Sequence, residues 1–312
     1  MKCQKLGRLY VPDGRKPWSV SHAANPTPVS LGGDLYRIYF ATRDAGNRSH
    51  TGWIEVDLKD PFRILAEASE PALGPGELGM FDDSGVSIGC VVPVEDKRFL
   101  YYMGWNLAVT VPWKNAIGLA VANGSESTFL RHSRFPVLDL CEADPYTMTY
   151  PWVLRDGATY RMWYGSSTRW LENRKEMRHV LKYAESVDGI HWIRDGSVVV
   201  DIENPGEMAL VKPCVIRDPD RYRMWFSALK DGPVEAYRIL YAESRDGVSW
   251  ERKDDETWID VSESGWDSEM VAYGTVFDHG GSRYMLYAGN GCGREGFGLA
   301  ILDESRTPES AS

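Results

Sequence analysis

The chain repeats one pattern of aromatic and apolar positions five times. Its copies read YRIYF at 36–40, FLYYM at 99–103, YRMWY at 160–164, YRMWF at 222–226 and YMLYA at 284–288. Successive copies begin 63, 61, 62 and 62 residues apart, counted along Tyr36, Phe99, Tyr160, Tyr222 and Tyr284. A period this constant indicates a repeat architecture.

Each repeat has the same internal order of apolar and polar segments. An apolar stretch comes first, a polar turn of four residues follows, and the aromatic segment and a loop of variable length come next. Four repeats then carry an Ala-containing apolar strand, at 117–122, 181–186, 239–244 and 297–302. Two of them continue through an Asp-Gly turn to a Trp, in SVDGIHW and SRDGVSW. Short strands joined by such turns predict an antiparallel sheet in every repeat.

Four short antiparallel strands, repeated five times, predict an all-β chain folded as a five-bladed β-propeller. No apolar periodicity of 3.6 residues supports a helical solenoid instead. The last repeat lacks a fourth strand after 297–303, whereas the apolar segment at 5–11 has no partner in its own repeat. We therefore expect the N-terminal strand to close the last blade. Residues 1–303 are expected to form one domain, and the polar residues 304–312 a flexible tail.

The composition narrows the classes of function. Of the 312 residues, 43% are hydrophobic and 26% charged, which is enough for a folded core. The net charge of −10 disfavours nucleic acid as a partner, and no apolar run is long enough for a membrane helix. The N-terminus lacks the apolar stretch of a secretory signal. Five scattered cysteines without a CxxC pair fit a reduced protein, so we expect a cytoplasmic location.

Motifs for a metal or a cofactor are not found in the sequence. The six histidines are dispersed, with no HxH or HExxH spacing, so no metal site is expected. A phosphate-binding GxxxxGK[ST] loop is absent, and the GxGxxG match at 291–296 precedes a strand rather than a helix. We therefore expect no cofactor.

Loop lengths indicate which end of the propeller carries the site. The loops after the aromatic segments are long and lie at the end where the first strand of each repeat begins. Asp83 lies six residues before Gly89 of its first strand, and Glu207 lies six before Pro213 of its own. Glu269 lies five residues before Gly274. Equivalent positions in a propeller form one ring around the axis. We therefore predict Asp83, Glu207 and Glu269 as the acid–base set, with Glu207 or Glu269 as proton donor; the alternative is that they cap turns.

Further residues at the same end are candidates for substrate binding. Tryptophans beside carboxylates suit a sugar site, because pyranose rings stack on aromatic faces, although the same tryptophans could simply pack between blades. Arg43 and Asp44 end an aromatic strand, where they either grip the substrate or form an ordinary loop ion pair. Cations in these loops suggest that the ligand is anionic, and a solvated mixed-charge loop is the alternative. The predicted substrate-binding set is His22, Asn25, Arg43, Asp44, Asp82, Trp105, Trp152, Lys212, Tyr273 and Asn290.

Several longer strings resemble a bacterial family of five-bladed, glycosidase-like propellers. They are RIYFATRD at 37–44, GMFDDSGV at 79–86, LYYMGW at 100–105, YRMWYGSS at 160–167, AESVDGIHW at 184–192, WDSEMVAYG at 266–274 and YAGNGCGREGFGLA at 287–300. The chain is more distantly similar to the arabinanase, levansucrase and invertase superfamily of glycoside hydrolases. That resemblance implies an Asp on each of the first two blades and a Glu on the third. Here Asn25 stands where the first Asp is expected, Asp82 and Asp83 match the second, and Glu142 is distant from Pro151.

The sequence thus predicts a carbohydrate-active enzyme, a glycoside hydrolase or transglycosidase with two carboxylates beside the scissile bond. Two other classes remain: a non-catalytic glycan-binding propeller, and a lyase or cyclase acting on a sugar-derived or natural-product substrate. The partner in each case is a small molecule or an oligosaccharide, with no nucleic acid and no membrane. The sugar, the linkage, the stereochemical outcome and the oligomeric state stay open.

Overall fold

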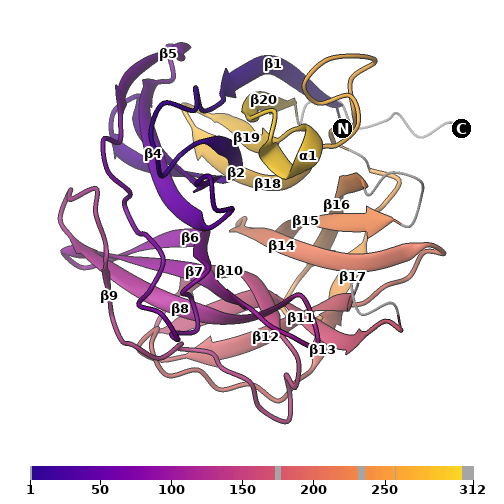
Figure 1. Ribbon diagram of the computed structural model, residues 1–312. Coiled ribbons are helices and arrows are strands. Elements are labelled where there is room, and N and C mark those ends of the chain that lie inside the picture. Colours follow the sequence, from indigo (N-terminus) through magenta and orange to yellow (C-terminus); the bar gives the residue numbers. More distant parts are fainter. Residues whose placement is uncertain (1, 173–176, 231–235, 257, 304–312) are drawn as a thin grey trace, which may run out of the picture.

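The computed structural model describes residues 2–172, 177–230, 236–256 and 258–303 (Figure 1). The predicted tail, 304–312, lies outside the described residues. Over these residues the chain is all-β apart from one short helix, α1 (Asn290–Gly293). No described helix has the length and apolar character needed to cross a membrane.

The strands fall into five successive sets that follow the sequence repeats. The first set is β2 (Ser21–Gly32), β3 (Leu35–Arg43), β4 (Ser49–Asp57) and β5 (Asp60–Glu67). The second is β6 (Gly85–Val94), β7 (Lys97–Leu107), β8 (Trp113–Asn123) and β9 (Leu130–Arg131). The third is β10 (Met148–Asp156), β11 (Thr159–Trp170), β12 (Met177–Ser186) and β13 (Val198–Val200). The fourth is β14 (Glu207–Arg217), β15 (Tyr222–Lys230), β16 (Ala236–Ser244) and β17 (Trp250–Arg252). The last is β18 (Ala272–His279), β19 (Ser282–Ala288), β20 (Phe297–Asp303) and the N-terminal β1 (Lys2–Tyr10).

Within each set the strands pair antiparallel in this order. β1 pairs antiparallel with β20, from Lys2 opposite Asp303 to Tyr10 opposite Phe297. The first strands of the sets contact one another in a ring, β2 with β6, β6 with β10, β10 with β14, β14 with β18 and β18 with β2. Figure 1 shows these five strands innermost, with the later strands of each set farther out. Side chains of the first strands therefore meet along a common axis.

The repeated aromatic segments and Asp-Gly turns interlock between neighbouring sets. Tyr101 Oη donates a hydrogen bond of 2.7 Å to the carbonyl of Gly189 in the turn of the next set, and Trp163 Nε1 donates one of 2.8 Å to Gly247. Both glycines have left-handed backbones, with φ of 74° and 79°. A Cβ on Gly189 would lie 2.7 Å from Tyr101 Oη. The turn therefore needs glycine for both its conformation and its packing.

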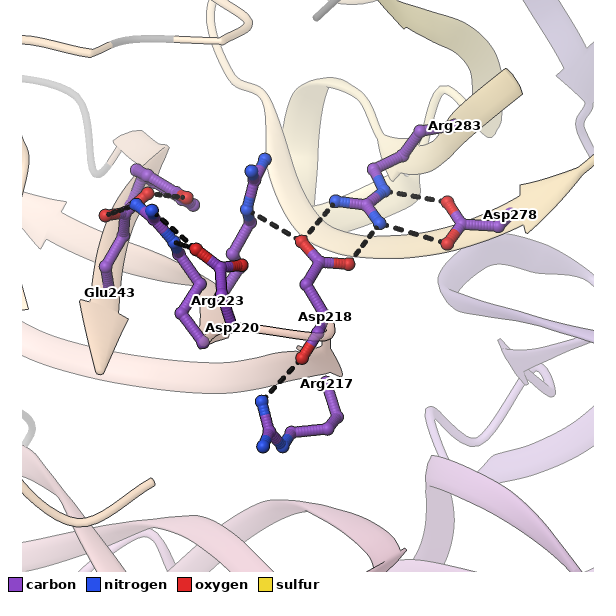
Figure 2. A network of polar contacts seen from close by, with 9 residues as sticks. Arg217, Asp218, Asp220, Arg223, Glu243, Asp278 and Arg283 are labelled. Carbon is purple, nitrogen blue, oxygen red and sulfur yellow. Dashed lines mark hydrogen bonds and ion pairs between the residues drawn. The ribbon is translucent and has the colours of Figure 1, made fainter. Parts of the chain in front are cut away.

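A network of ion pairs joins the fourth and fifth sets (Figure 2). Asp218, in the turn after β14, accepts a hydrogen bond of 2.7 Å from Nη2 of Arg283 on β19 and pairs at 2.8 Å with Nε of Arg223 on β15. Arg283 Nε also donates to Asp278 Oδ1 on β18, at 2.7 Å. The side chains of Asp218, Arg223 and Arg283 are mostly buried, so the network links the two sheets through charge-assisted hydrogen bonds.

Replacing Asp218 with Asn should lower the free energy of unfolding by about 1–3 kcal/mol, the range for losing hydrogen bonds to charged groups. Urea unfolding of the wild type and the variant measures the difference. The matched control is Asp220→Asn, because Asp220 is exposed and pairs with Arg221 at the surface. Equal losses in the two variants would contradict a linking role for Asp218.

Candidate functional site

A small cavity lies on the axis at the end where the innermost strands begin. Its volume is ≈ 90 Å³, and its walls come from β2, β3, β4, β6, β10, β18 and α1. The lining residues are His22, Ala24, Asn25, Ala41, Thr42, Arg43, Ser49, Ser87, Tyr150, Tyr273 and Cys292. The loop joining β3 to β4 leaves the sheet at this same end. We call this space the axial cavity.

Backbone strain is concentrated around the axial cavity. The lining residues with left-handed backbones are His22 (φ 64°), Asn25 (φ 52°), Tyr150 (φ 37°), Tyr273 (φ 56°) and Cys292 (φ 57°). Such a conformation costs a residue other than glycine on the order of 1–3 kcal/mol, and it clusters at functional sites. The strain supports a binding or catalytic role for this end of the axis.

Four of the innermost strands produce a left-handed residue at the same position. Asn25, Tyr150, Lys212 and Tyr273 each directly precede a Pro or Gly and sit at a shift in strand register. A β-bulge of this kind redirects a side chain away from the regular pleat. The position before the Pro or Gly is thus the sequence signal that would have identified Tyr150, which the prediction omitted.

The floor of the axial cavity is polar but uncharged. The rings of Tyr150 and Tyr273 lie 5.4 Å apart, and Tyr150 also interacts with Asn25. Burial raises the pKa of both tyrosines, so their hydroxyl groups stay protonated at neutral pH. Asn25 Oδ1 is buried without a hydrogen-bond partner among the described residues. The cavity therefore offers hydroxyl donors and an unused acceptor to a ligand.

Positive charge surrounds His22 on the wall of the cavity. Burial, together with the nearby guanidinium groups of Arg43 and Arg294, lowers the pKa of His22 to about 4. Its Nδ1 lies 2.9 Å from Ser21 Oγ. The imidazole is therefore neutral at pH 7 in the unliganded protein.

All three predicted acids lie outside the cavity lining. Asp83, in the turn before β6, accepts hydrogen bonds from the Gly79 amide at 3.0 Å and from Ser84 Oγ at 2.9 Å. Glu269 is exposed just before β18, and its backbone amide donates to Asn290 Oδ1 at 2.8 Å. Both precede innermost strands that line the cavity, which places them at the same end of the axis.

Glu207 has a different environment from the other two predicted acids. Its carboxylate is buried and accepts hydrogen bonds from Arg252 Nη2 at 2.7 Å, Arg252 Nη1 at 2.9 Å and Asn204 Nδ2 at 2.9 Å. Although burial alone would raise the pKa of Glu207, these hydrogen bonds and the charge of Arg252 lower it to about 2. The carboxyl group is therefore ionised at neutral pH and has no proton to donate.

Some of the predicted substrate-binding residues line the axial cavity or contact its wall. His22, Asn25, Arg43 and Tyr273 line the axial cavity. Trp105 does not line the cavity but holds one of its lining residues, because its Nε1 donates a hydrogen bond of 2.7 Å to Ser49 Oγ.

Other members of the predicted set hold the fold together. Asp82 is fully buried and pairs with Arg131 Nε at 2.8 Å. Asp44 pairs with Arg48 and His50. The Asn290 side chain holds the backbone amides of residues 269 and 270.

Lys212 and Trp152 occupy the axis beneath the cavity. Lys212 is fully buried, its Nζ donates to the Gly89 carbonyl at 2.9 Å, and it lies 5.1 Å from the centre of the Trp152 ring. Burial lowers the pKa of Lys212. Trp152 lines a second cavity of ≈ 460 Å³ at the opposite end of the axis. Lys212 therefore lies between the two cavities.

Among the described residues, no group of three or more His, Cys, Asp or Glu side chains is placed to hold a metal ion.

Comparisons with known proteins identify relatives and the fold. Over 303 residues, 97% of this chain and 100% of each relative, the chain is 51% identical to the uncharacterized protein MT1551 and 50% identical to the uncharacterized protein Rv1502, both of Mycobacterium tuberculosis. No family model matches the chain.

Solved structures of glycoside-hydrolase-like propellers share the fold. One described as a glycoside hydrolase aligns with a TM-score of 0.75 at 20% identity, covering 99% of this chain and 93% of that one. An endo-arabinase from Bacteroides thetaiotaomicron VPI-5482 aligns with a TM-score of 0.65 at 14% identity, covering 94% of this chain and 97% of that one. At these identities the likeness concerns the fold.

Proposed function

This chain belongs to the family of the M. tuberculosis proteins MT1551 and Rv1502, and from its fold and axial cavity we propose that it is a carbohydrate-active enzyme. In this proposal residues 1–303 form one five-bladed propeller, and β1 completes the last blade. The substrate is a small molecule or an oligosaccharide that enters at the axial cavity. The observation that carries the proposal is the convergence of strained, polar side chains from several innermost strands on one cavity.

Hydrolysis or transfer of a glycosidic bond uses two carboxyl groups, one donating a proton and one acting as base or nucleophile. Because Arg252 keeps Glu207 ionised, we assign proton donation to Glu269, which is exposed at the cavity's end of the axis. Asp83 at the same end is the proposed base or nucleophile. Glu207 is then a positioning residue, held by Arg252 at the start of β14.

One observation favours a second candidate, a glycan-binding protein without catalysis. No carboxylate belongs to the cavity lining within the described ranges, and on the first strand of the first set the lining residue is the neutral Asn25. A lyase or cyclase that works without two carboxylates would also fit a cavity whose lining contains no carboxylate.

The variants Asp83→Asn and Glu269→Gln should each fold normally and lose about 10²-fold or more in rate, the size expected when acid–base help is removed. Release of nitrophenol from a panel of nitrophenyl glycosides measures the rate. Glu70→Gln is the matched control, because Glu70 is exposed and lies outside the cavity lining. Full activity in both site variants would refute the assignment. Saturable binding on a glycan array without turnover of any glycoside would favour the glycan-binding alternative.

A further inference from the structure

Two arginines beside the axial cavity have no acidic partner among the residues that the structure describes. Arg43 lines the cavity, and its Nη1 donates to Asn47 Oδ1 at 2.6 Å. Arg294, exposed just after α1, is close enough to act on the charge of His22. Neither guanidinium forms an ion pair with any residue that the structure describes. The neighbouring carboxylates are engaged elsewhere, Asp44 with Arg48 and Glu295 with Arg8.

This local charge is opposite to that of the whole molecule. The chain carries a net charge of −10, yet the charged groups around His22 are cationic. Asn25 contributes a neutral amide where a carboxylate would introduce a negative charge. Unpaired guanidinium groups beside a buried polar cavity suit carboxylate and phosphate groups, which accept two parallel hydrogen bonds from one arginine.

The size of the cavity limits how much of a ligand it can take. Pockets that enclose a whole small ligand measure about 300–1,000 Å³. The axial cavity measures ≈ 90 Å³, and the buried Lys212 lies between it and the second cavity. It can therefore enclose one substituent or part of one sugar ring, and the rest of the ligand must lie outside among the loops.

We propose that the axial cavity binds an oxyanion, the carboxylate or phosphate group of an acidic sugar, between Arg43, Arg294 and His22. This inference rests on the proposed carbohydrate function and narrows its substrate to acidic sugars. The tyrosine hydroxyls and Asn25 then bind the hydroxyl groups next to the charged substituent.

Calorimetric titration of the full chain tests the charge preference. The probes are glucuronate, galacturonate and mannuronate, each against its parent hexose, with glucose 6-phosphate and inorganic phosphate as separate arms. At least one acidic sugar should bind about tenfold or more tightly than its neutral parent. Tight binding of inorganic phosphate without preference for any acidic sugar would refute the proposal that the bound oxyanion belongs to a sugar. The subsite would then bind a free anion.

Arginine variants test the assignment to these residues. Arg43→Gln and Arg294→Gln should each reduce the charged-to-neutral affinity ratio by about fivefold or more. Asn25→Asp should reduce it as well, because it places a negative charge in the cavity. Arg63→Gln, which removes an exposed arginine on β5, is the matched control and should leave the ratio unchanged. An unchanged ratio in all three site variants would overturn the proposal.

The pH dependence of binding reports on His22 separately. The charged groups facing its imidazole are Arg43 from β3 and Arg294 after α1, and Tyr150 of β10, Tyr273 of β18 and Cys292 of α1 share the cavity with it. A bound oxyanion favours the imidazolium form and so raises the pKa of His22 from about 4. Uronate affinity should therefore increase as the pH falls from 7 to 5. The variant His22→Asn should lose this increase, and pH-independent binding in the wild type would contradict an anion beside His22.

The outcomes separate this inference from the proposed function. Turnover of neutral glycosides with no preference for charge would overturn the oxyanion subsite and leave the carbohydrate-active enzyme intact. Binding of acidic sugars through both arginines, without turnover of any glycoside, would support the subsite and refute the enzyme.

Discussion

Truncating Arg252 to Ala should lower the free energy of unfolding by about 3–5 kcal/mol, because it leaves a buried carboxylate without its counter-charge. The Arg252 side chain is 3% exposed and the Glu207 side chain is fully buried, and the two share hydrogen bonds of 2.7 and 2.9 Å. The same guanidinium binds Asp254 Oδ2 at 2.6 Å and the Asp201 carbonyl at 2.9 Å. The substitution thus removes the side chain that links β17, which ends at Arg252, to the start of β14 at Glu207.

Chemical unfolding of single and double variants would check this expectation. The double variant Arg252→Met, Glu207→Leu should be more stable than Arg252→Ala, because apolar replacement of both partners removes the unpaired charge. Arg15→Ala is the control, since Arg15 is exposed and pairs with Asp13 at the surface. A loss below about 1 kcal/mol for Arg252→Ala, the range of a surface pair, would show that the buried pair does not stabilise the fold.

The Arg252–Glu207 pair also makes the stability depend on pH. The pKa of Glu207 is about 2 in the folded chain against an ordinary 4.5, so folding favours its ionised form. Its contribution, on the order of 1–3 kcal/mol after solvent screening, is complete above about pH 4.5 and is lost as the pH falls towards 2. In Arg252→Ala this part of the acid dependence should be weaker, because the main group that lowers the pKa is missing.

The repeat period identified the strands because their packing is local and repeated. Each aromatic segment fills the interface to a neighbouring set, as Tyr101 and Tyr164 do between the second and third sets. The same chemistry therefore recurs at each interface, and the sequence must repeat it. The Asp-Gly turns recur for a related reason, because Gly189 and Gly247 receive hydrogen bonds from the aromatic segments.

The partners of the acids could not be found in the same way. Glu207 is held by Arg252, 45 residues later, and Asp82 by Arg131, 49 residues later. Neither arginine belongs to the repeated pattern, so equal spacing of the acids suggested equal roles where the structure gives them different ones. Glu207 is kept ionised by its buried pair with Arg252, Asp83 accepts hydrogen bonds within a turn, and Glu269 is exposed.

The residues of the cavity followed the pattern only in part. His22, Asn25, Arg43 and Tyr273 were predicted from their places at the ends of strands, and they do line one cavity. Tyr150 was missed because a residue before Pro is ordinarily extended, whereas here it has a left-handed backbone. The left-handed backbone depends on the surrounding strands, and the sequence marks it only through the Pro or Gly that follows this position in four of the innermost strands.

Removing residues 2–10, and with them β1, should lower the melting temperature by about 10 °C or more. The strand pairs with β20 over its whole length, and Leu9 is buried among side chains of β2, β3, β19 and β20. The Tyr10 ring lies 4.9 Å from that of Phe40 and 5.9 Å from that of Phe297, which joins the first set to the last. Deletion would expose the edge of β20 together with these apolar contacts, and an open edge also promotes aggregation.

A peptide of residues 1–12 added to the truncated chain should restore the melting temperature, because β1 is then supplied as a separate strand. The same peptide with Leu9→Asp is the matched control and should restore little, since a carboxylate would have to be buried in the apolar cluster. In the full chain, Leu9→Ala should cost about 2–5 kcal/mol, and this variant tests the strand even where the truncated chain does not fold. A truncated chain that melts like the wild type, or a Leu9→Ala variant of unchanged stability, would contradict a closing role for β1. The fifth set would then be stable as three strands, and the proposed propeller would not depend on its N-terminus.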